Sequence, residues 1–165
     1  MSLEPLLAAP LAIQIHASAA SAAMVLGAVI LFRRKGTKMH KLMGRIWVGL
    51  MLIVATSAIF INEIRLIGPF SPIHIFVVFT YVGLWQAVRE IRRGNVEAHQ
   101  AGMKSIYLGA LLLTGAFTLM PGRRMHDVLF GAESGWTPSM IAIPLALMVT
   151  AYLWWRLMPR RARVA

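Results

Sequence analysis

The chain contains no cysteine, which excludes disulfides, thiolate metal sites and cysteine nucleophiles. Charged residues are also scarce: they make up 14% of the sequence, against about a quarter in soluble domains. Only six residues are acidic, and all of them fall in loops or near the ends of apolar segments. The sequence therefore offers no buried carboxylate pair, and it contains neither a glycine-rich phosphate loop nor a Ser-His-Asp arrangement.

Apolar residues are abundant instead: they form 58% of the 165 residues, and the mean hydropathy is +0.68. A single domain of this length has no aqueous core large enough to bury so much apolar surface. The composition therefore predicts an all-α integral membrane protein. No basic region precedes the first apolar run, which argues against a cleaved signal peptide.

Five apolar segments approach the roughly 20 residues that a helix needs to cross the hydrocarbon core of a bilayer. We expect these spans at about residues 6–32, 42–61, 69–89, 101–120 and 138–158, the third starting near Pro69 or Pro72. A long outer loop would occupy about residues 121–137, and the whole chain, 1–165, would form one transmembrane domain.

The formal net charge of +11 comes from basic residues that cluster between the apolar runs. Such clusters are typical of cytoplasmic loops that face anionic lipid, so we expect the bilayer, and not nucleic acid, as the partner. Counting Lys and Arg near the span ends places the N-terminus outside and the C-terminus inside. The inner residues are Arg33, Arg34, Lys35, Lys38, Lys41, Arg45, Arg89, Arg92, Arg93, Lys104, Arg156, Arg160, Arg161 and Arg163.

The sequence around the first two spans recurs in the next two, at an offset of about 59 residues. We therefore predict two parallel-repeat helical hairpins, at about residues 10–62 and 69–120, that form a four-helix bundle beside the fifth helix. The matched residues include histidines, glycines, cations and aromatics: His16 with His74, His40 with His99, Gly44 with Gly102, Arg45 with Lys104, and Trp47 with Tyr107.

The four repeated histidines would lie in two layers, because His16 and His74 fall in the outer half of their spans and His40 and His99 near the inner boundary. Under a two-fold axis along the membrane normal, the members of each pair face each other. Two facing imidazoles are the axial ligands of a six-coordinate haem b, which needs no cysteine. The sequence thus predicts one or two haem groups with His16, His74, His40 and His99 as iron ligands.

Each of these features also has a structural interpretation. The small residues from Ala17 to Ala23 would give a porphyrin space, or they would let two helices pack closely. His16 would bind iron, or it would hydrogen-bond a hydroxyl group on a neighbouring helix. His40 and His99 would bind iron, or they would lie among lipid headgroups. We interpret His126, which has no repeat partner, as a loop residue.

Three functions follow from these alternatives. The first is a b-type cytochrome that carries electrons across the membrane from quinol or another reductant to an outer acceptor. The second is a non-catalytic accessory subunit that packs against a larger membrane complex. The third is a proton or solute pathway through His16 and His74, although no acidic relay residue lies inside the spans. No motif decides whether the protein is an enzyme.

Two segments resemble the motifs of an uncharacterised bacterial family of multi-span membrane proteins. The first is His40–Val48 (HKLMGRIWV), and the second is Gly94–Ser105 (GNVEAHQAGMKS); His16 also fits the pattern. The family more often has an aromatic residue at Gly102 and arginine at Lys41 and Lys104. The resemblance covers roughly residues 10–120 and implies a multi-pass protein of the bacterial inner membrane. The helix layout is also similar to that of diheme transmembrane cytochromes b.

Overall fold

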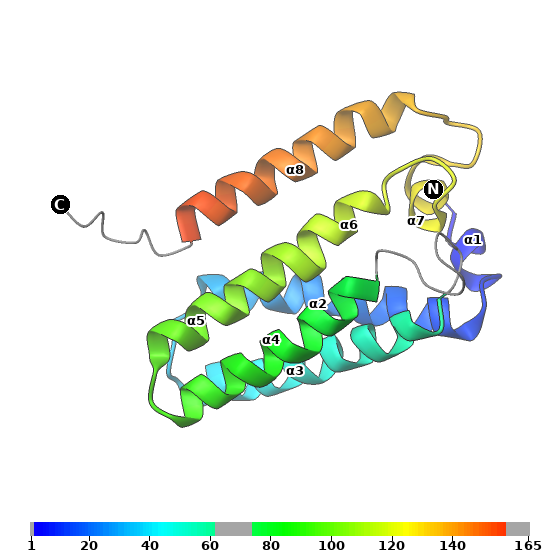
Figure 1. Ribbon diagram of the computed structural model, residues 1–165. Helices are drawn as coiled ribbons and strands as arrows, with labels where there is room; N and C mark the ends of the chain where they lie inside the picture. The colour runs from blue at the N-terminus through cyan, green and yellow to red at the C-terminus, as the bar shows by residue number, and fades with distance from the viewer. Residues whose placement is uncertain (1, 62–73, 158–165) are drawn as a thin grey trace. The chain divides into compact units, whose positions relative to one another are not determined.

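The computed structural model describes residues 2–61 and 74–157, and within these ranges the chain is helical with no strand (Figure 1). The chain forms two compact units, one within Leu3–Val82 and one that begins at Gly83, inside helix α4. The start of the third predicted span, with Pro69 and Pro72, lies outside the described residues, as do Arg160, Arg161 and Arg163.

The N-terminal unit is built on a hairpin of two long helices, α2 (Leu11–Phe32) and α3 (Lys38–Ile59). The short helix α1 (Glu4–Leu7) precedes them and packs against α2. The first span was predicted to start near residue 6, but Pro10 has an extended backbone and separates α1 from α2. Ala19, Ala23 and Gly27 form the buried stripe of α2, on which α3 packs closely.

The C-terminal unit contains most of α4 (His74–Arg92), followed by a continuous helical stretch of three segments. These are α5 (Val96–Ser105), the π-helix η1 (Ile106–Leu113) and α6 (Thr114–Phe117). The short helix α7 (Arg124–Phe130) and the long helix α8 (Thr137–Leu157) complete the unit. Ile106 and Leu108 of the π-helix are fully buried, and α8 packs along η1 and α6.

Both hairpin turns are closed by the same local chemistry. Gly36 and Gly94 have φ angles of 81°, which a residue with a Cβ rarely adopts. The next residue caps the following helix in each case: Thr37 accepts a hydrogen bond from the backbone N–H of His40, and Asn95 accepts one from that of Ala98. These caps start α3 and α5 four to five residues before the predicted positions 42 and 101.

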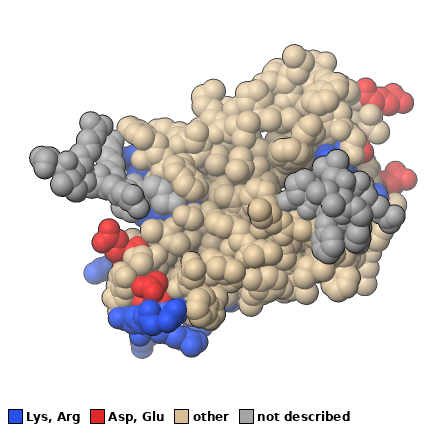
Figure 2. Space-filling view, viewed as in Figure 1, with Lys and Arg blue, Asp and Glu red and all other residues tan. Residues whose placement is uncertain are grey.

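Three described helices, α2, α3 and α8, are long and apolar enough to cross a membrane. Charged side chains on the face shown in Figure 2 lie toward the helix ends, and uncharged residues make up the surface between them. Many large apolar side chains of α8 are exposed, among them Met140, Ile141 and Met148. Apolar side chains this exposed along a long helix are expected where lipid, and not water, surrounds the protein.

Candidate functional site

The imidazole of His16 lies between α2 and α3. Its Nδ1 is 3.0 Å from the carbonyl oxygen of Val54 and 3.2 Å from the hydroxyl oxygen of Ser57. A carbonyl oxygen can only accept, and the Ser57 hydroxyl itself donates to the carbonyl oxygens of Ile53 and Val54. The proton of His16 is therefore on Nδ1, and Nε2 carries the lone pair that could bind a metal.

His99 has the same arrangement in the C-terminal unit. It lies in the first turn of α5, and its Nδ1 is 2.9 Å from the carbonyl oxygen of Ala87 in α4. Nδ1 must donate this hydrogen bond, which again leaves the lone pair on Nε2. Among the described residues, none makes a hydrogen bond to Nε2 of either His16 or His99. Metal-binding histidines commonly donate their other ring N–H to a carbonyl in this way.

The other two predicted ligands lie at the starts of two other helices. His74 is the first described residue of α4, and His40 is the third residue of α3; both are half-buried. His40 lies two helical turns before the buried Trp47 and therefore on the same, inward face of α3. The pairing of His16 with His74 and of His40 with His99 stays a prediction.

The small residues next to His16 are used at least in part for helix packing. Ala23 is completely buried, and its carbonyl oxygen accepts a hydrogen bond of 2.9 Å from the indole Nε1 of Trp47. Trp47 is itself 4% exposed, so it belongs to the core between α2 and α3. This contact matches the structural interpretation of the small-residue run. The Ser57 contact likewise matches the structural interpretation of His16.

The interpretation of His126 as a loop residue is wrong, because it lies in α7 and is 1% exposed. Both of its ring nitrogens are engaged, Nε2 with the carbonyl oxygen of Gly135 at 3.0 Å and Nδ1 with Asp127 at 3.3 Å. The ring also makes an edge contact with Phe130. His126 therefore stabilises the connection between α7 and α8, and neither of its ring nitrogens is available to bind a metal.

The sequence did not indicate the acceptors that orient His16 and His99, because backbone carbonyls of Val54 and Ala87 carry no residue-specific signal. The sequence predicted a hydroxyl partner for His16 on a neighbouring helix, but it did not indicate that Ser57 supplies it. Within the described residues, no group of three or more His, Asp and Glu side chains is placed to hold a metal ion. A haem with two axial histidines does not require such a group.

Comparison with known proteins gives a family and nothing closer. No curated protein and no solved structure matches the chain. A family model described as "Predicted membrane protein (DUF2306)" matches residues 13–155, which include α3 and most of α2 and α8. The match covers far more than half of the sequence, and the chain therefore belongs to this family of membrane proteins.

Proposed function

We propose that the protein binds haem b within the membrane and carries electrons across the bilayer. The observation that supports this proposal is a hydrogen bond that His16 and His99 have in common. Each histidine donates Nδ1–H to a backbone carbonyl of the neighbouring helix. Such a bond fixes the tautomer and the ring plane, and it leaves Nε2 to bind iron. In this proposal His74 and His40 would also hold the haem iron.

The proposal includes five membrane crossings. In the C-terminal unit, Ser139 donates to the carbonyl oxygen of Leu119, and Lys104 Nζ donates to that of Leu157. The first contact joins the start of α8 to the end of the stretch that begins with α5, and the second joins their opposite ends. These two helical stretches therefore run antiparallel. At about 1.5 Å per residue, α4 and the stretch 96–117 are each roughly as long as the hydrocarbon core is thick.

Bound haem would supply a one-electron couple, with its iron alternating between the ferrous and ferric states. A quinol donor would give up two electrons and two protons, and the haem that His16, His74, His40 and His99 would hold would supply a one-electron couple for each electron. From His16 to Phe32 is 16 residues, or roughly 24 Å along the helix, so haems at the two ends would divide the crossing into shorter electron transfers.

The first experiment is an absorption spectrum of the protein purified from haem-sufficient cells. We expect a sharp reduced-minus-oxidised band of low-spin haem, and loss of haem in His16→Gly and His99→Gly that added imidazole restores. His126→Asn is the matched control, because both nitrogens of His126 are already used, and its haem content per folded protein should be unchanged. A colourless protein that takes up no haem on reconstitution would refute the proposal. Copurification of such a colourless protein with a larger complex would instead support an accessory subunit.

The proposed orientation, with the N-terminus outside, can be tested with the same protein because it contains no cysteine. Ala132→Cys lies between α7 and α8, and Arg34→Cys lies in the turn between α2 and α3; both positions are exposed. An impermeant maleimide added to intact cells should label Cys at position 132 and not at position 34. The reverse labelling would show the opposite orientation, and equal labelling of both would contradict the odd number of spans.

A further inference from the structure

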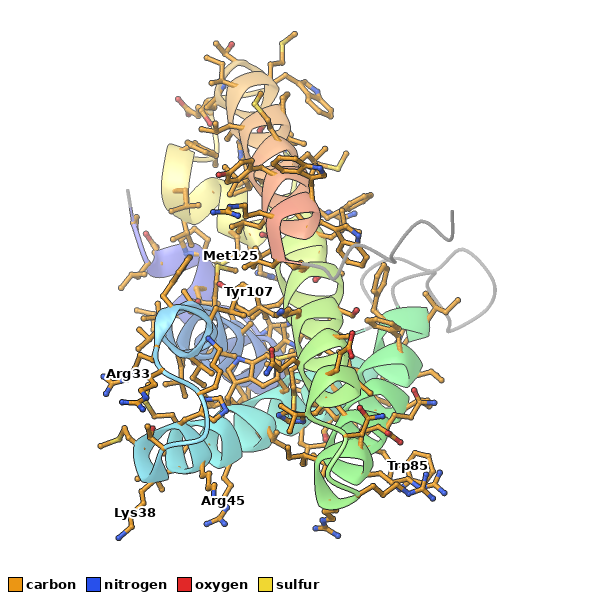
Figure 3. All side chains as sticks on the ribbon, turned by 90° about the vertical axis from the view of Figure 1, so that its left-hand side faces the viewer. Arg33, Lys38, Arg45, Trp85, Tyr107 and Met125 are labelled. Atoms are coloured by element: carbon orange, nitrogen blue, oxygen red, sulfur yellow. The ribbon has the colours of Figure 1, made fainter. Side chains whose placement is uncertain are left out.

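Three cations share one exposed face at the start of α3. Lys38, Lys41 and Arg45 recur at spacings of three and four residues, so they lie on one side of the helix. All three are exposed, whereas Trp47, on the opposite side, is buried. Figure 3 shows the side chains of Lys38 and Arg45 extending from the same side of α3, away from α2. We call Lys38, Lys41 and Arg45 the α3 basic face.

No carboxylate near in sequence neutralises this face, since the chain has no Asp or Glu between Glu4 and Glu63. Within the described part of the chain, none of the three cations forms an ion pair or a hydrogen bond with another residue. Lys35, in the adjacent turn, differs because its ammonium group donates to the carbonyl oxygens of Ile30, Leu31 and Arg33. The ammonium group of Lys35 thus satisfies carbonyl groups at the C-terminal end of α2, whereas the three cations of the α3 basic face make no such contact.

At Arg45 the absence of a partner anion is energetically costly. It lies seven residues, or about 10 Å, along α3 from Lys38, inside a helix that is apolar enough to span a membrane. A cation on the lipid-facing side at this depth must extend toward the headgroups or pair with an anion. A lipid phosphate at the level of the headgroups meets both needs, because a guanidinium group binds phosphate with two parallel hydrogen bonds.

The corresponding cation of the second hairpin has a hydrogen-bond acceptor within the protein. Lys104, which matches Arg45 in the sequence pattern, donates from Nζ to the carbonyl oxygen of Leu157 at 2.9 Å. Charges of the second turn are also used internally: Arg93 pairs with Glu90 at 3.7 Å, and Arg89 lies 5.1 Å from the ring centre of Trp85. Arg45 and Lys104 therefore differ in whether they need an external anion.

Exposed apolar side chains lie next to the cations on α3 and continue along the helix. Leu42 and Ile46 are 52% and 50% exposed, and Ile53 is 46% exposed further along the helix. Gly49 lies between them with no atom within 4 Å of the position that a Cβ would occupy. An exposed surface that passes from cations to apolar side chains along a membrane helix fits the headgroup and acyl chains of one lipid.

We infer that the α3 basic face binds an anionic phospholipid, whose phosphate lies against Lys38, Lys41 and Arg45 and whose acyl chains lie along Leu42 and Ile46. The inference is independent of haem, because it uses none of the proposed iron ligands. It assigns the lipid to the first hairpin and not to the second.

The test is native mass spectrometry of the full chain in a neutral detergent, titrated with phosphatidylglycerol or phosphatidylcholine. We expect phosphatidylglycerol adducts at concentrations at which phosphatidylcholine gives none. Removing one cation from a headgroup site should lower the affinity roughly fivefold, so Arg45→Gln should show that loss and a triple glutamine variant of the basic face roughly a hundredfold loss. Arg45→Lys keeps the charge but not the two parallel hydrogen bonds, so it should lose less affinity than Arg45→Gln.

Lys104→Gln is the matched control, since it removes a cation of the second hairpin, and it should bind phosphatidylglycerol as the unchanged protein does. Should Arg45→Gln fail to fold, Lys41→Gln on the same face provides the measurement. The inference is overturned by equal binding of both lipids, by an equal loss in Lys104→Gln, or by unchanged binding in the triple variant. Competition by inorganic phosphate at equal concentration would indicate a site for free phosphate and would also overturn it, as would an acidic protein that copurifies through this face.

Discussion

Alanine substitutions at two glycines that match in the sequence pattern should have opposite effects on stability. Gly102 of α5 faces α4, where a Cβ would lie 3.0 Å from the Cβ and 3.6 Å from the Cα of Ala87. At Gly44 of α3, a Cβ would meet no atom within 4 Å. The two positions therefore test whether the close approach of α5 to α4 at Gly102 stabilises the second hairpin. The first hairpin has no such close approach at Gly44.

The expected magnitudes follow from these distances. Carbon atoms in favourable contact are about 3.5–4.0 Å apart, so α4 and α5 must separate to admit Gly102→Ala. The Cβ of Ala87 is fixed to the backbone and cannot rotate away, so we expect a loss of about 1–3 kcal/mol, as for overpacked cores. Gly44→Ala adds a methyl group in open space and removes the entropic cost of glycine in a helix, which should stabilise by about 0.5–1 kcal/mol.

The assay is reversible unfolding of each variant in mixed micelles, followed by circular dichroism, with the unchanged protein measured in parallel. Gly102→Ala should unfold at a lower and Gly44→Ala at a higher denaturant fraction. A separation of the helices in Gly102→Ala should also weaken the His99 hydrogen bond to Ala87, which is 2.9 Å long. Our reasoning about α4 and α5 would be refuted by a Gly102→Ala protein as stable as Gly44→Ala.

Further expected outcomes concern three buried contacts, each measured by the same unfolding assay. Gly83→Ala should cost less than Gly102→Ala, because the new Cβ meets the side chain of Ile106 at 3.1 Å and a side chain can adjust where a backbone cannot; an equal or larger loss would contradict this. Trp47→Phe should cost about 1 kcal/mol through the lost hydrogen bond to Ala23, and no loss would mean that this bond is not formed. His126→Ala should destabilise by about 2 kcal/mol or more, because it removes two polar contacts and a buried ring. An unchanged midpoint would show that the α7–α8 connection does not depend on His126.

Much of the helical pattern could be predicted from hydropathy, and the errors at the helix ends have local causes. Long apolar runs predicted α2, α3 and α8, which the structure describes as helices able to cross a membrane. The predicted starts of α3 and α5 were too late because hydropathy does not register a capping residue. The π-helix η1 was not predictable, since a change in hydrogen-bond register leaves the apolar composition of Ile106–Leu113 unaltered.

The candidate site could be predicted only as a set of histidines. Their scarcity in spans made His16 and His99 noticeable, but their orientation depends on carbonyl oxygens of Val54 and Ala87 that any residue would offer at those positions. His126 shows the opposite error: because it has no repeat partner it was interpreted as a loop residue, whereas it is buried in α7. Asp127 and the carbonyl of Gly135 provide the polar partners that make this burial tolerable.

The contrast between Arg45 and Lys104 also gives the fifth helix a physical role. Lys104 lies in a helix beside α8, and the last carbonyls of a helix lack partners within that helix. The Leu157 carbonyl therefore accepts a hydrogen bond from Lys104, and the charge of Lys104 in turn stabilises the negative end of α8. Arg45 has the same place in the sequence pattern but no acceptor among the described residues, and we infer that a lipid phosphate supplies one. A helix that lies outside the predicted repeat thus makes the two hairpins chemically different, one completed by protein and the other, by our inference, by lipid.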